Sequence, residues 1–307
     1  MTQPVVVIEN LVKRYKELVA LDHLNLQINE GEIFGLLGPN GSGKTTAISC
    51  VLALLNFDKG SVKVFGKEIQ PDSYDIKKNI GVVLQNVAVF RELTVYENID
   101  YFCGLYIKDK RLRKQYVNEA VEFVGLGEYV KFYPKKLSGG LLRRLNIACG
   151  IAHKPKLIIL DEPTVAVDPQ SRNRILEGIE DLNAQGATVI YTSHYMEEVE
   201  QVCSRIAIID KGRKIAEGTK EELKKMIKTD EKIHIEVVGL SETQLSQLRQ
   251  LPHVYRADYA ANELTVYCNG GKHNIVHILK YLQENEVSFG RVYTQLPTLN
   301  DVFLEIT

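Results

Sequence analysis

The stretch Glu32-Ile-Phe-Gly-Leu-Leu-Gly38-Pro-Asn-Gly-Ser-Gly-Lys44-Thr-Thr46 decides the fold of this chain. Its first residues, Glu32–Leu37, are mostly apolar and predict a buried strand. A helix is expected to follow from about Lys44 to Leu54. Between them lies the pattern G-x-x-x-x-G-K-[ST], which indicates a phosphate-binding loop when a strand precedes it and a helix follows it. The stretch therefore predicts a nucleotide-binding α/β fold.

The residues of this loop suit the phosphates of a nucleotide such as ATP. Gly41 and Gly43 allow the backbone to turn its N–H groups around phosphate oxygens. Lys44 is expected to reach the β- and γ-phosphates, and Thr45 to bind Mg²⁺. The alternative, a glycine-rich turn with an unrelated lysine, is disfavoured by the strand and helix on either side. The other nucleotide-binding residues predicted in the loop are Asn40, Ser42 and Thr46.

A second helix start that suits an anion lies at Leu137-Ser-Gly-Gly140. Apolar residues recur with helical spacing from Leu141 to Ile151, and Ser138 is suited to cap that helix. Gly139 and Gly140 leave the backbone N–H groups of the helix start open to an anion.

Two carboxylates, Asp161 and Glu162, follow the apolar strand Leu157–Leu160. Ligand crevices of open α/β sheets lie at the carboxyl ends of the strands, so the pair is expected in the nucleotide site. Asp161 is predicted to hold the Mg²⁺ shell, and Glu162 to act as the general base on the attacking water. A solvated acidic loop is the alternative interpretation.

In this order, Gly38–Thr46, Leu137–Gly140 and Asp161-Glu162 resemble the nucleotide-binding subunit of an ATP-binding cassette (ABC) transporter. The resemblance extends from about Val5 to Thr219. It is specific because most other P-loop proteins lack the Leu-Ser-Gly-Gly signature. It implies an ATPase that binds ATP and Mg²⁺.

The resemblance also assigns roles to residues outside these motifs. Tyr15 matches the aromatic residue that stacks on adenine, and Gln85 matches the glutamine that reaches Mg²⁺ and the catalytic water. Asp168 matches the loop aspartate that communicates across a dimer, and His194 matches the switch histidine near the γ-phosphate. Each of these residue types alone is more often a packed or solvated side chain.

Two positions depart from the family pattern. Leu141 follows the signature where glutamine is frequent, and Ala166 stands where glycine is common in exporter relatives. Neither change removes a catalytic group. The segment 146–173 and the ending Leu299–Ile306 look most like bacterial exporter subunits of the drug, antibiotic and lantibiotic-resistance kind.

In this family the signature of one subunit closes on the phosphate loop of the other. The resemblance therefore implies a homodimer in which Ser138, Gly139 and Gly140 complete the partner's ATP site. It further implies separate transmembrane permease subunits and a peripheral location at the cytoplasmic face of the cell membrane. Phe90, Tyr96 and Tyr101 are candidates for the surface that docks on the permease, although buried aromatic residues are the simpler interpretation.

Two domains are expected from the order of predicted elements. Residues 1–228 would form the ATPase domain, an α/β P-loop core with an antiparallel β subdomain and a helical insertion over about 95–153. Residues 232–307 would form a small α+β, ferredoxin-like module with an accessory or regulatory role, joined through a polar linker near Thr229–Glu231. The charged segment Thr219–Lys228 is expected to be helical.

Composition excludes several other classes of protein. The chain has 38 basic and 39 acidic residues and a net charge of -1, so no nucleic-acid partner is predicted. Its five cysteines lack metal-ligand spacing and indicate small buried residues in a reducing compartment. No signal peptide is expected at the start, and no apolar run approaches the ~20 residues of a membrane span. Contact with the membrane is therefore expected only through the permease.

Three alternatives remain from the sequence alone. A cassette ATPase without a transport role would act on ribosomes or DNA, but such relatives usually carry two cassettes or long coiled coils. A P-loop GTPase or kinase would leave the signature Leu137–Gly140 unexplained. The Asn-Lys-x-Asp motif that reads guanine is also absent from the sequence. An importer subunit is the third alternative, because the direction of transport is inferred only from the resemblance to the exporter subgroup.

Overall fold

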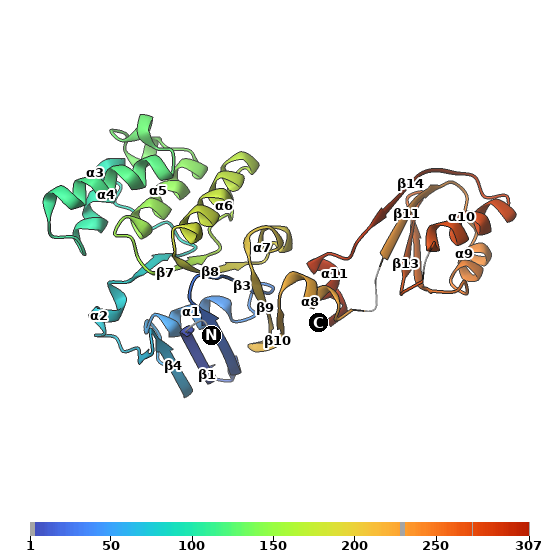
Figure 1. Cartoon of the computed structure of the whole chain (residues 1–307), viewed down its shortest axis with the longest axis horizontal. Helices are drawn as coiled ribbons and strands as arrows, with labels where there is room; N and C mark the ends of the chain where they lie inside the picture. The colour runs from blue at the N-terminus through green and yellow to red at the C-terminus, as the bar shows by residue number, and fades with distance from the viewer. Residues whose placement is uncertain (1–3, 228–230, 272, 307) are drawn as a thin grey trace. The chain divides into compact units, whose positions relative to one another are not determined.

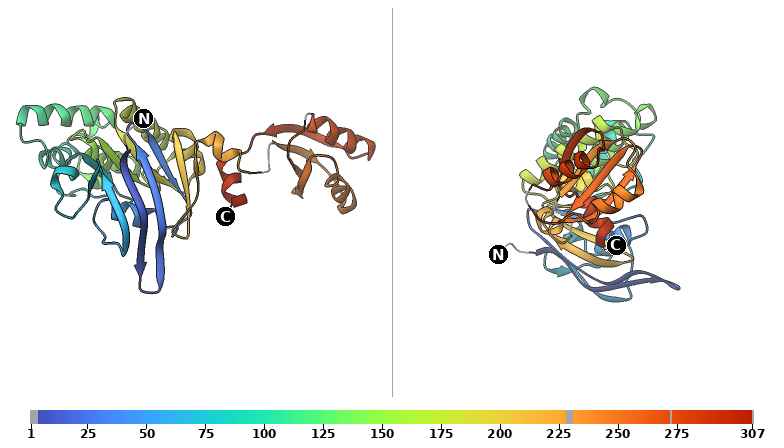
Figure 2. Two further views of the ribbon diagram at one scale, coloured as in Figure 1. Left: turned by 60° about the horizontal axis from the view of Figure 1, so that its bottom comes forward. Right: turned by 90° about the vertical axis from the view of Figure 1, so that its right-hand side faces the viewer.

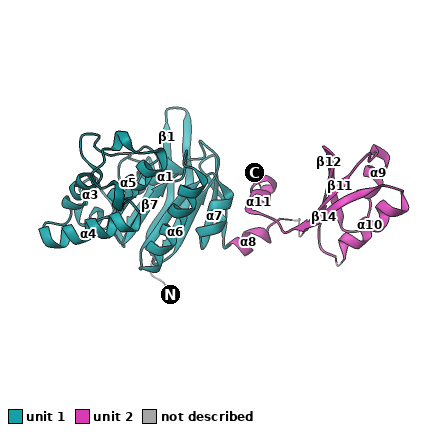
Figure 3. Ribbon diagram, turned by 90° about the horizontal axis from the view of Figure 1, so that it is seen from above, with its two compact units in different colours: residues 1–219 teal, residues 220–307 magenta. Residues whose placement is uncertain are grey.

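Two separate sets of contacts divide the chain into compact units of residues 1–219 and 220–307 (Figure 3). The structure is a computed structural model that describes residues 4–227, 231–271 and 273–306 (Figure 1). The break at Thr219 lies before the boundary at residue 228 expected from the sequence. The short helix α8 (Lys220–Lys224) therefore belongs to the second unit, where it packs against α11 (Leu299–Ile306).

Six strands form the central sheet of the first unit, in the order β10-β9-β3-β8-β7-β6. Neighbouring strands from β9 to β6 are parallel, and β10 is the antiparallel partner of β9 at one edge. Parallel strands covered on both faces are apolar along their length, which explains runs such as Leu157–Leu160. The bounds are β3 Ile33–Leu37, β6 Ile80–Val83, β7 Leu157–Asp161, β8 Thr188–Ser193, β9 Arg205–Asp210 and β10 Arg213–Gly218.

Helices cover both faces of this sheet (Figure 1). On one face, α1 (Lys44–Val51) contributes Ala47 and Ile48 to a core shared with the antiparallel sheet. On the other face, α7 approaches β3 closely at Gly35, where an added Cβ would lie 2.8 Å from Val199 Cγ1. The helices of this second face are α5 (Gly139–Ile151), α6 (Pro169–Ala184) and α7 (Met196–Val202).

A second, antiparallel sheet has the order β2-β1-β4-β5. Its first two strands form the long hairpin drawn in blue in Figure 2. Buried Leu24, Leu26 and Ile28 alternate with exposed residues along β2, which is the pattern of a half-buried strand. The bounds are β1 Pro4–Tyr15, β2 Leu18–Asn29, β4 Lys59–Val64 and β5 Lys67–Glu68.

The helical block begins after β6 and ends with α5. Each of its α-helices starts at a side chain that accepts a hydrogen bond from the backbone of the first turn: Thr94, Asp109 and Ser138. The block comprises α3 (Val95–Gly104), α4 (Lys110–Phe123), the 3₁₀ turns Gly127–Tyr129 and Pro134–Lys136, and α5. A further short helix, α2 (Tyr74–Lys77), precedes β6.

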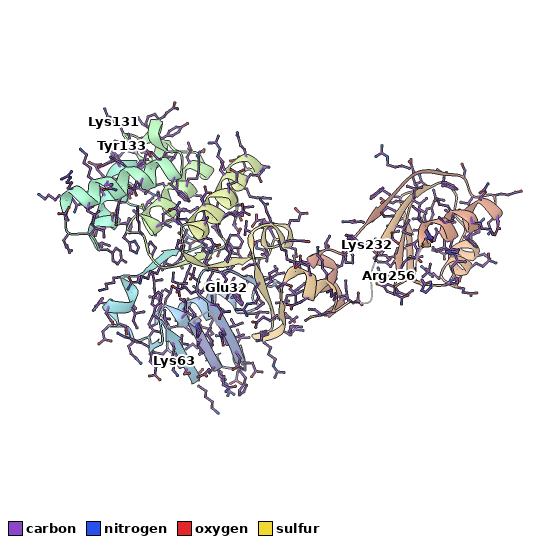
Figure 4. The ribbon with its side chains drawn as sticks, viewed as in Figure 1. Glu32, Lys63, Lys131, Tyr133, Lys232 and Arg256 are labelled. Atoms are coloured by element: carbon purple, nitrogen blue, oxygen red, sulfur yellow. The ribbon has the colours of Figure 1, made fainter. Side chains whose placement is uncertain are left out.

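The second unit contains an antiparallel sheet of order β12-β13-β11-β14, the strand order of a ferredoxin-like fold. Its core is apolar, with Ile233, Leu264 and Leu282 fully buried. Lys232 and Arg256, labelled in Figure 4, lie 5.4 and 4.9 Å from the ring centroid of Tyr267. The elements are β11 Glu231–Val237, α9 Glu242–Leu248, β12 Val254–Ala260, β13 Glu263–Cys268, α10 Asn274–Glu284 and β14 Phe289–Gln295.

The predicted fold class is confirmed, and most predicted elements lie within a few residues of the observed ones. Helix α8 ends at Lys224, so the predicted helix to Lys228 is too long; its last residue and most of the expected linker lie outside the described residues. Within the described ranges, no helix has the length and apolar character needed to cross a membrane.

Candidate active site

The phosphate loop lies between β3 and α1, as the motif requires. Gly41 and Gly43 have φ of 82° and 109°, the left-handed region that glycine adopts without strain. Helix α1 has no side-chain cap at Gly43, so its first N–H groups are available to an anion. The Ser42 hydroxyl is buried and has no hydrogen-bond partner among the described residues. These features form a cradle that fits the phosphates of ATP.

Lys44 is 5% exposed and lies inside this loop. Its Nζ donates to the carbonyl oxygens of Gly38 and Pro39, at 2.8 and 3.2 Å. It also lies 3.5 Å from Oε1 of Glu162. The ammonium group therefore connects the phosphate loop to the acidic end of β7.

Glu162 is held in a strained backbone conformation directly after β7. Its φ is 50°, which is uncommon for residues other than glycine and costs of order 1–3 kcal/mol. The surrounding structure stabilises this conformation, because the Glu162 N–H donates to the carbonyl oxygen and the hydroxyl of Thr192, at 3.2 and 3.1 Å. The glutamate is only 7% exposed, so β8 fixes the place from which its side chain acts.

The carboxylate of Glu162 joins the side chains predicted to be catalytic. Oε1 lies 3.2 Å from His194 Nδ1 and 3.5 Å from Lys44 Nζ, and Oε2 accepts a hydrogen bond from Gln85 Nε2 at 3.3 Å. Lys44 begins α1 after the loop that follows β3, and the other three lie in the loops after β6, β7 and β8. The carboxyl ends of four parallel strands thus bring Lys44, Gln85, Glu162 and His194 together, although they are spread over 150 residues.

Oxygen ligands suited to a hard cation lie beside this cluster. The Thr45 hydroxyl donates to Oδ2 of Asp161 at 2.9 Å, and the Thr192 hydroxyl donates to Oδ1 at 2.5 Å. Mg²⁺ is typically bound by one or two protein oxygens together with substrate phosphates. Thr45 and Asp161 fit that requirement, and Thr192 orients the carboxylate. Sequence reasoning missed Thr192, because a threonine at the end of a β-strand carries no motif.

The Gln85 loop is anchored to helix α5. The buried Arg143 donates from Nη1 to the carbonyl oxygen of Leu84 and from Nη2 to that of Gln85, at 3.1 and 2.7 Å. One turn later, Asn146 Oδ1 accepts from the N–H of Ala88 at 3.0 Å. These anchors were not predicted, since arginine and asparagine in an amphipathic helix usually indicate its solvated face.

The signature segment forms a separate cluster with the loop before α6. Ser138 caps α5 and accepts from the N–H of Leu141 at 3.3 Å. An added Cβ on Gly140 would lie 2.5 Å from Ser171 Oγ and 3.0 Å from Asp168 Oδ2, whereas one on Gly139 would meet only the Ala166 oxygen at 3.7 Å. Gly139 is therefore open, and Gly140 is needed for packing.

Asp168 caps helix α6, and its Oδ1 accepts from the N–H of Ser171 at 2.9 Å. That hydrogen bond holds the pKa of the Asp168 carboxyl below its usual value. In the part of the chain that the structure describes, no hydrogen bond or ion pair joins Ser138, Gly139, Gly140 or Asp168 to the phosphate loop or Glu162. The predicted site residues thus form two clusters within one chain.

Ala166, in the same loop, has a φ of 59°. Alanine in this left-handed region is strained by roughly 1–2 kcal/mol, whereas glycine is not. A glycine, which the family pattern implies at this position, would adopt the same φ without that strain.

Tyr15 ends β1 at the turn of the long hairpin and is 43% exposed, with Lys13 Nζ 5.2 Å from its ring centroid. The hairpin's second strand reaches the phosphate loop, because an added Cβ on Gly43 would lie 2.7 Å from the Ala20 oxygen. The ring is thus exposed on an element that contacts the phosphate loop.

Comparisons with known proteins identify the family. A family described as "ABC transporter" matches residues 21–165, and one described as "ATP-binding protein DrrA1-3-like, C-terminal domain" matches residues 218–307. The linearmycin resistance ATP-binding protein LnrL of Bacillus subtilis (strain 168) is 40% identical over 301 residues, which are 97% of this chain and 97% of that protein. The chain belongs to the ABC transporter ATP-binding proteins.

Other relatives of this ABC ATPase span most of its length. The daunorubicin resistance ATP-binding protein DrrA3 of Streptomyces coeruleorubidus is 32% identical over 309 residues, 100% of this chain and 97% of that protein. A dimeric structure of the ATP-binding cassette MJ0796 in a post-hydrolysis state, bound to ADP and Pi, is 28% identical with a TM-score of 0.64. The match covers 70% of this chain and 98% of the MJ0796 chain. The family and this cassette agree with the site in identifying a protein that binds and hydrolyses ATP.

Proposed function

We propose that this ATPase is the energy-supplying subunit of an export transporter, in which two copies of the chain bind ATP and Mg²⁺ between them. The single observation that carries the proposal is the separation of its predicted site residues into two clusters. One cluster holds Lys44 and Glu162, and the other presents the open start of α5 at Ser138 and Gly139. Each chain then supplies two different halves of an ATP site.

The chemistry proposed for the first half is attack of water on the γ-phosphate, with ADP and phosphate as products. Glu162 accepts the proton of the attacking water, and its strained backbone fixes the carboxylate for that task. Lys44 and His194 lie on one side of the carboxylate and are suited to stabilise negative charge on the phosphate oxygens. Gln85 orients the water from the other side.

Thr45 and Asp161 are proposed to hold Mg²⁺. When bound, the ion would neutralise charge on the phosphates. The Thr192 hydroxyl keeps Oδ1 of Asp161 occupied, so that Oδ2 remains directed toward Thr45. Tyr15 is proposed to stack on the adenine ring, as its exposure on the hairpin allows.

Export is proposed from the relatives. LnrL and DrrA3 are named for antibiotic resistance, and a Nod factor export ATP-binding protein I of Ralstonia nicotianae (strain ATCC BAA-1114 / GMI1000) is 34% identical over 309 residues. That match covers 99% of this chain and 94% of that protein. The substrate passes through separate transmembrane permease subunits in this proposal, and the chain acts at the cytoplasmic face of the membrane.

An aromatic patch next to the Gln85 loop is the proposed docking surface for the permease. Phe90 and Tyr101 are 41% and 47% exposed, and their rings meet edge to face at 4.8 Å between centroids. Exposed aromatic residues are typical of protein interfaces. Tyr96, the third candidate, is half-buried and contributes less to this surface.

Two substitutions test the proposed ATP site. Glu162→Gln should bind ATP, lose roughly a hundredfold or more of the turnover, and accumulate as an ATP-dependent dimer. Ser138→Arg should bind ATP and lose hydrolysis, since the arginine blocks the anion-binding start of α5 in the partner's site. Turnover by radiolabelled ATP and dimer mass by light scattering provide the measurements. Parent-like turnover of Glu162→Gln rejects the assigned base, and unchanged turnover of Ser138→Arg rejects the shared site.

A further inference from the structure

Glu198, a buried carboxylate outside the predicted site, connects the segments that carry the site residues. Glu198 lies in the first turn of α7 and is 3% exposed. Its Oε2 accepts three hydroxyl hydrogen bonds, and its Oε1 lies 3.2 Å from Arg172 Nε. The hydroxyl donors are Thr164 at 2.7 Å, Tyr191 at 2.7 Å and Ser193 at 3.1 Å. Burying a carboxylate is costly without such partners.

The partners of Glu198 adjoin residues of the proposed ATP site. Thr164 lies two residues after Glu162, and Ser193 directly precedes His194. Arg172 lies in the first turn of α6, and its N–H donates to the carbonyl oxygen of Asp168 at 2.9 Å. One carboxylate thus fixes the loop after the proposed base, the turn before the histidine and the start of the helix that Asp168 caps.

Ser193 and Arg172 each connect Glu198 to the residues next to His194. The Ser193 hydroxyl donates to Glu198 and accepts from the N–H of Tyr195 at 2.9 Å, which defines the turn that carries His194. Arg172 lies over the Tyr195 ring with Cζ 5.3 Å from the centroid, and that ring lies 4.1 Å from the ring of His194. The two sequence neighbours of His194, Ser193 and Tyr195, are therefore both held by this network.

We infer that Glu198 is a positioning residue for ATP hydrolysis, which holds Glu162 and His194 in their mutual arrangement without contacting ATP. The inference rests on the proposed roles of those two residues. The partners of Glu198 are Thr164, Tyr191, Ser193 and Arg172, and none of them is a proposed ATP ligand. Removal of Glu198 should therefore lower kcat and leave the binding of ATP intact.

Glu198→Gln is the test, since it preserves the side-chain volume and one oxygen acceptor but places an amide beside three donors and Arg172. We expect kcat to fall about tenfold or more. We expect KM for ATP and the binding constant of ATP, from calorimetry, to stay within about twofold of the parent, because Glu198 does not contact ATP in this proposal. A tenfold loss in affinity would correspond to about 1.4 kcal/mol of lost binding energy. Glu197→Gln, an exposed neighbour in the same helix turn, is the matched control and should retain the parent kcat.

A double-mutant cycle distinguishes positioning from loss of folding. Thr164→Val removes one hydroxyl from Glu198, so its effect on kcat should overlap with that of Glu198→Gln instead of multiplying with it. If Glu198→Gln does not fold, Thr164→Val and Ser193→Ala should each lower kcat with unchanged ATP binding. Equal losses of kcat and ATP affinity, multiplying effects in the cycle, or a kcat within twofold of the parent would overturn the inference. Glu162→Gln is measured in parallel: if it loses turnover while Glu198→Gln does not, only the inference fails and the proposed function stands.

Discussion

The two glycines of the segment 137–140 face different surroundings. A Cβ on Gly140 would lie 2.5 Å from Ser171 Oγ, and one on Gly139 would lie no closer than 3.7 Å to the Ala166 oxygen. Gly140→Ala should therefore lower the free energy of unfolding by about 1–3 kcal/mol, the usual cost of overpacking, while Gly139→Ala should leave it nearly unchanged. Urea unfolding of both variants measures the difference. Adding Ser171→Gly should restore much of the loss in Gly140→Ala, and equal losses in both alanine variants would contradict the packing argument.

His153 is a buried neutral histidine that makes stability depend on pH. Burial lowers its pKa to about 4, and its ring stacks on Tyr106 at 4.1 Å between centroids. In the unfolded chain, this histidine binds a proton near pH 6.5. The contribution of His153 to the free energy of unfolding is therefore complete above that pH and is lost as the pH falls toward 4. The full loss amounts to roughly 3 kcal/mol.

His153→Phe, which preserves the stacking, should flatten the pH dependence of the free energy of unfolding between pH 7 and 5. Denaturant titrations at several pH values provide the measurement. His277→Gln, which replaces an exposed histidine, is measured as the control in the same titrations. A slope in His153→Phe equal to that of the parent would contradict the assignment.

At the scale of elements, helix α5 connects the signature to the Gln85 loop. Arg143 holds the carbonyl oxygens of Leu84 and Gln85 from that helix. Arg143→Met retains the apolar stem but releases the loop. We expect about a tenfold loss of kcat from the misplaced Gln85, with unchanged ATP binding. Arg111→Met, on the exposed start of α4, is the control, and a parent-like kcat in Arg143→Met would show that the loop holds its place without α5.

Elements with strong boundary signals could be predicted from the sequence. The start of helix α6 is marked in the sequence, because Asp168 is a cap and Pro169 occupies its first position. Strand β5 (Lys67–Glu68) and helix α2 (Tyr74–Lys77) were missed, since segments of two and four residues are too short to carry a periodic pattern. Short elements of this kind form through their neighbours and not through their own propensity.

The candidate site was predictable only where a motif marks it. Lys44, Asp161 and Glu162 lie in motifs at the ends of strands, so their meeting follows from the parallel sheet. Arg143 and Glu198 lie on helices outside any motif, and their burial depends on which loops pack above them. That packing is tertiary information which no local pattern contains.

In the whole molecule, the two separate clusters of each chain are proposed to be the two halves of an ATP site, which is complete only when two chains meet. Neither Glu162→Gln nor Ser138→Arg should hydrolyse ATP alone. In a mixed dimer, however, the phosphate loop and Glu162 of the Ser138→Arg chain meet the intact signature of the Glu162→Gln chain. Such a dimer has one intact site and one site with both defects.

The most direct measurement is therefore the ATPase rate of a one-to-one mixture of these two variants, compared with each variant alone. Random pairing makes half of the dimers mixed and half of their sites intact, so we expect recovery of about a quarter of the parent rate if the site is shared. Recovery should follow the fraction of mixed dimers as the mixing ratio is changed. A mixture no more active than the two variants measured separately, although both bind ATP, would show that the ATP site is not shared between two chains.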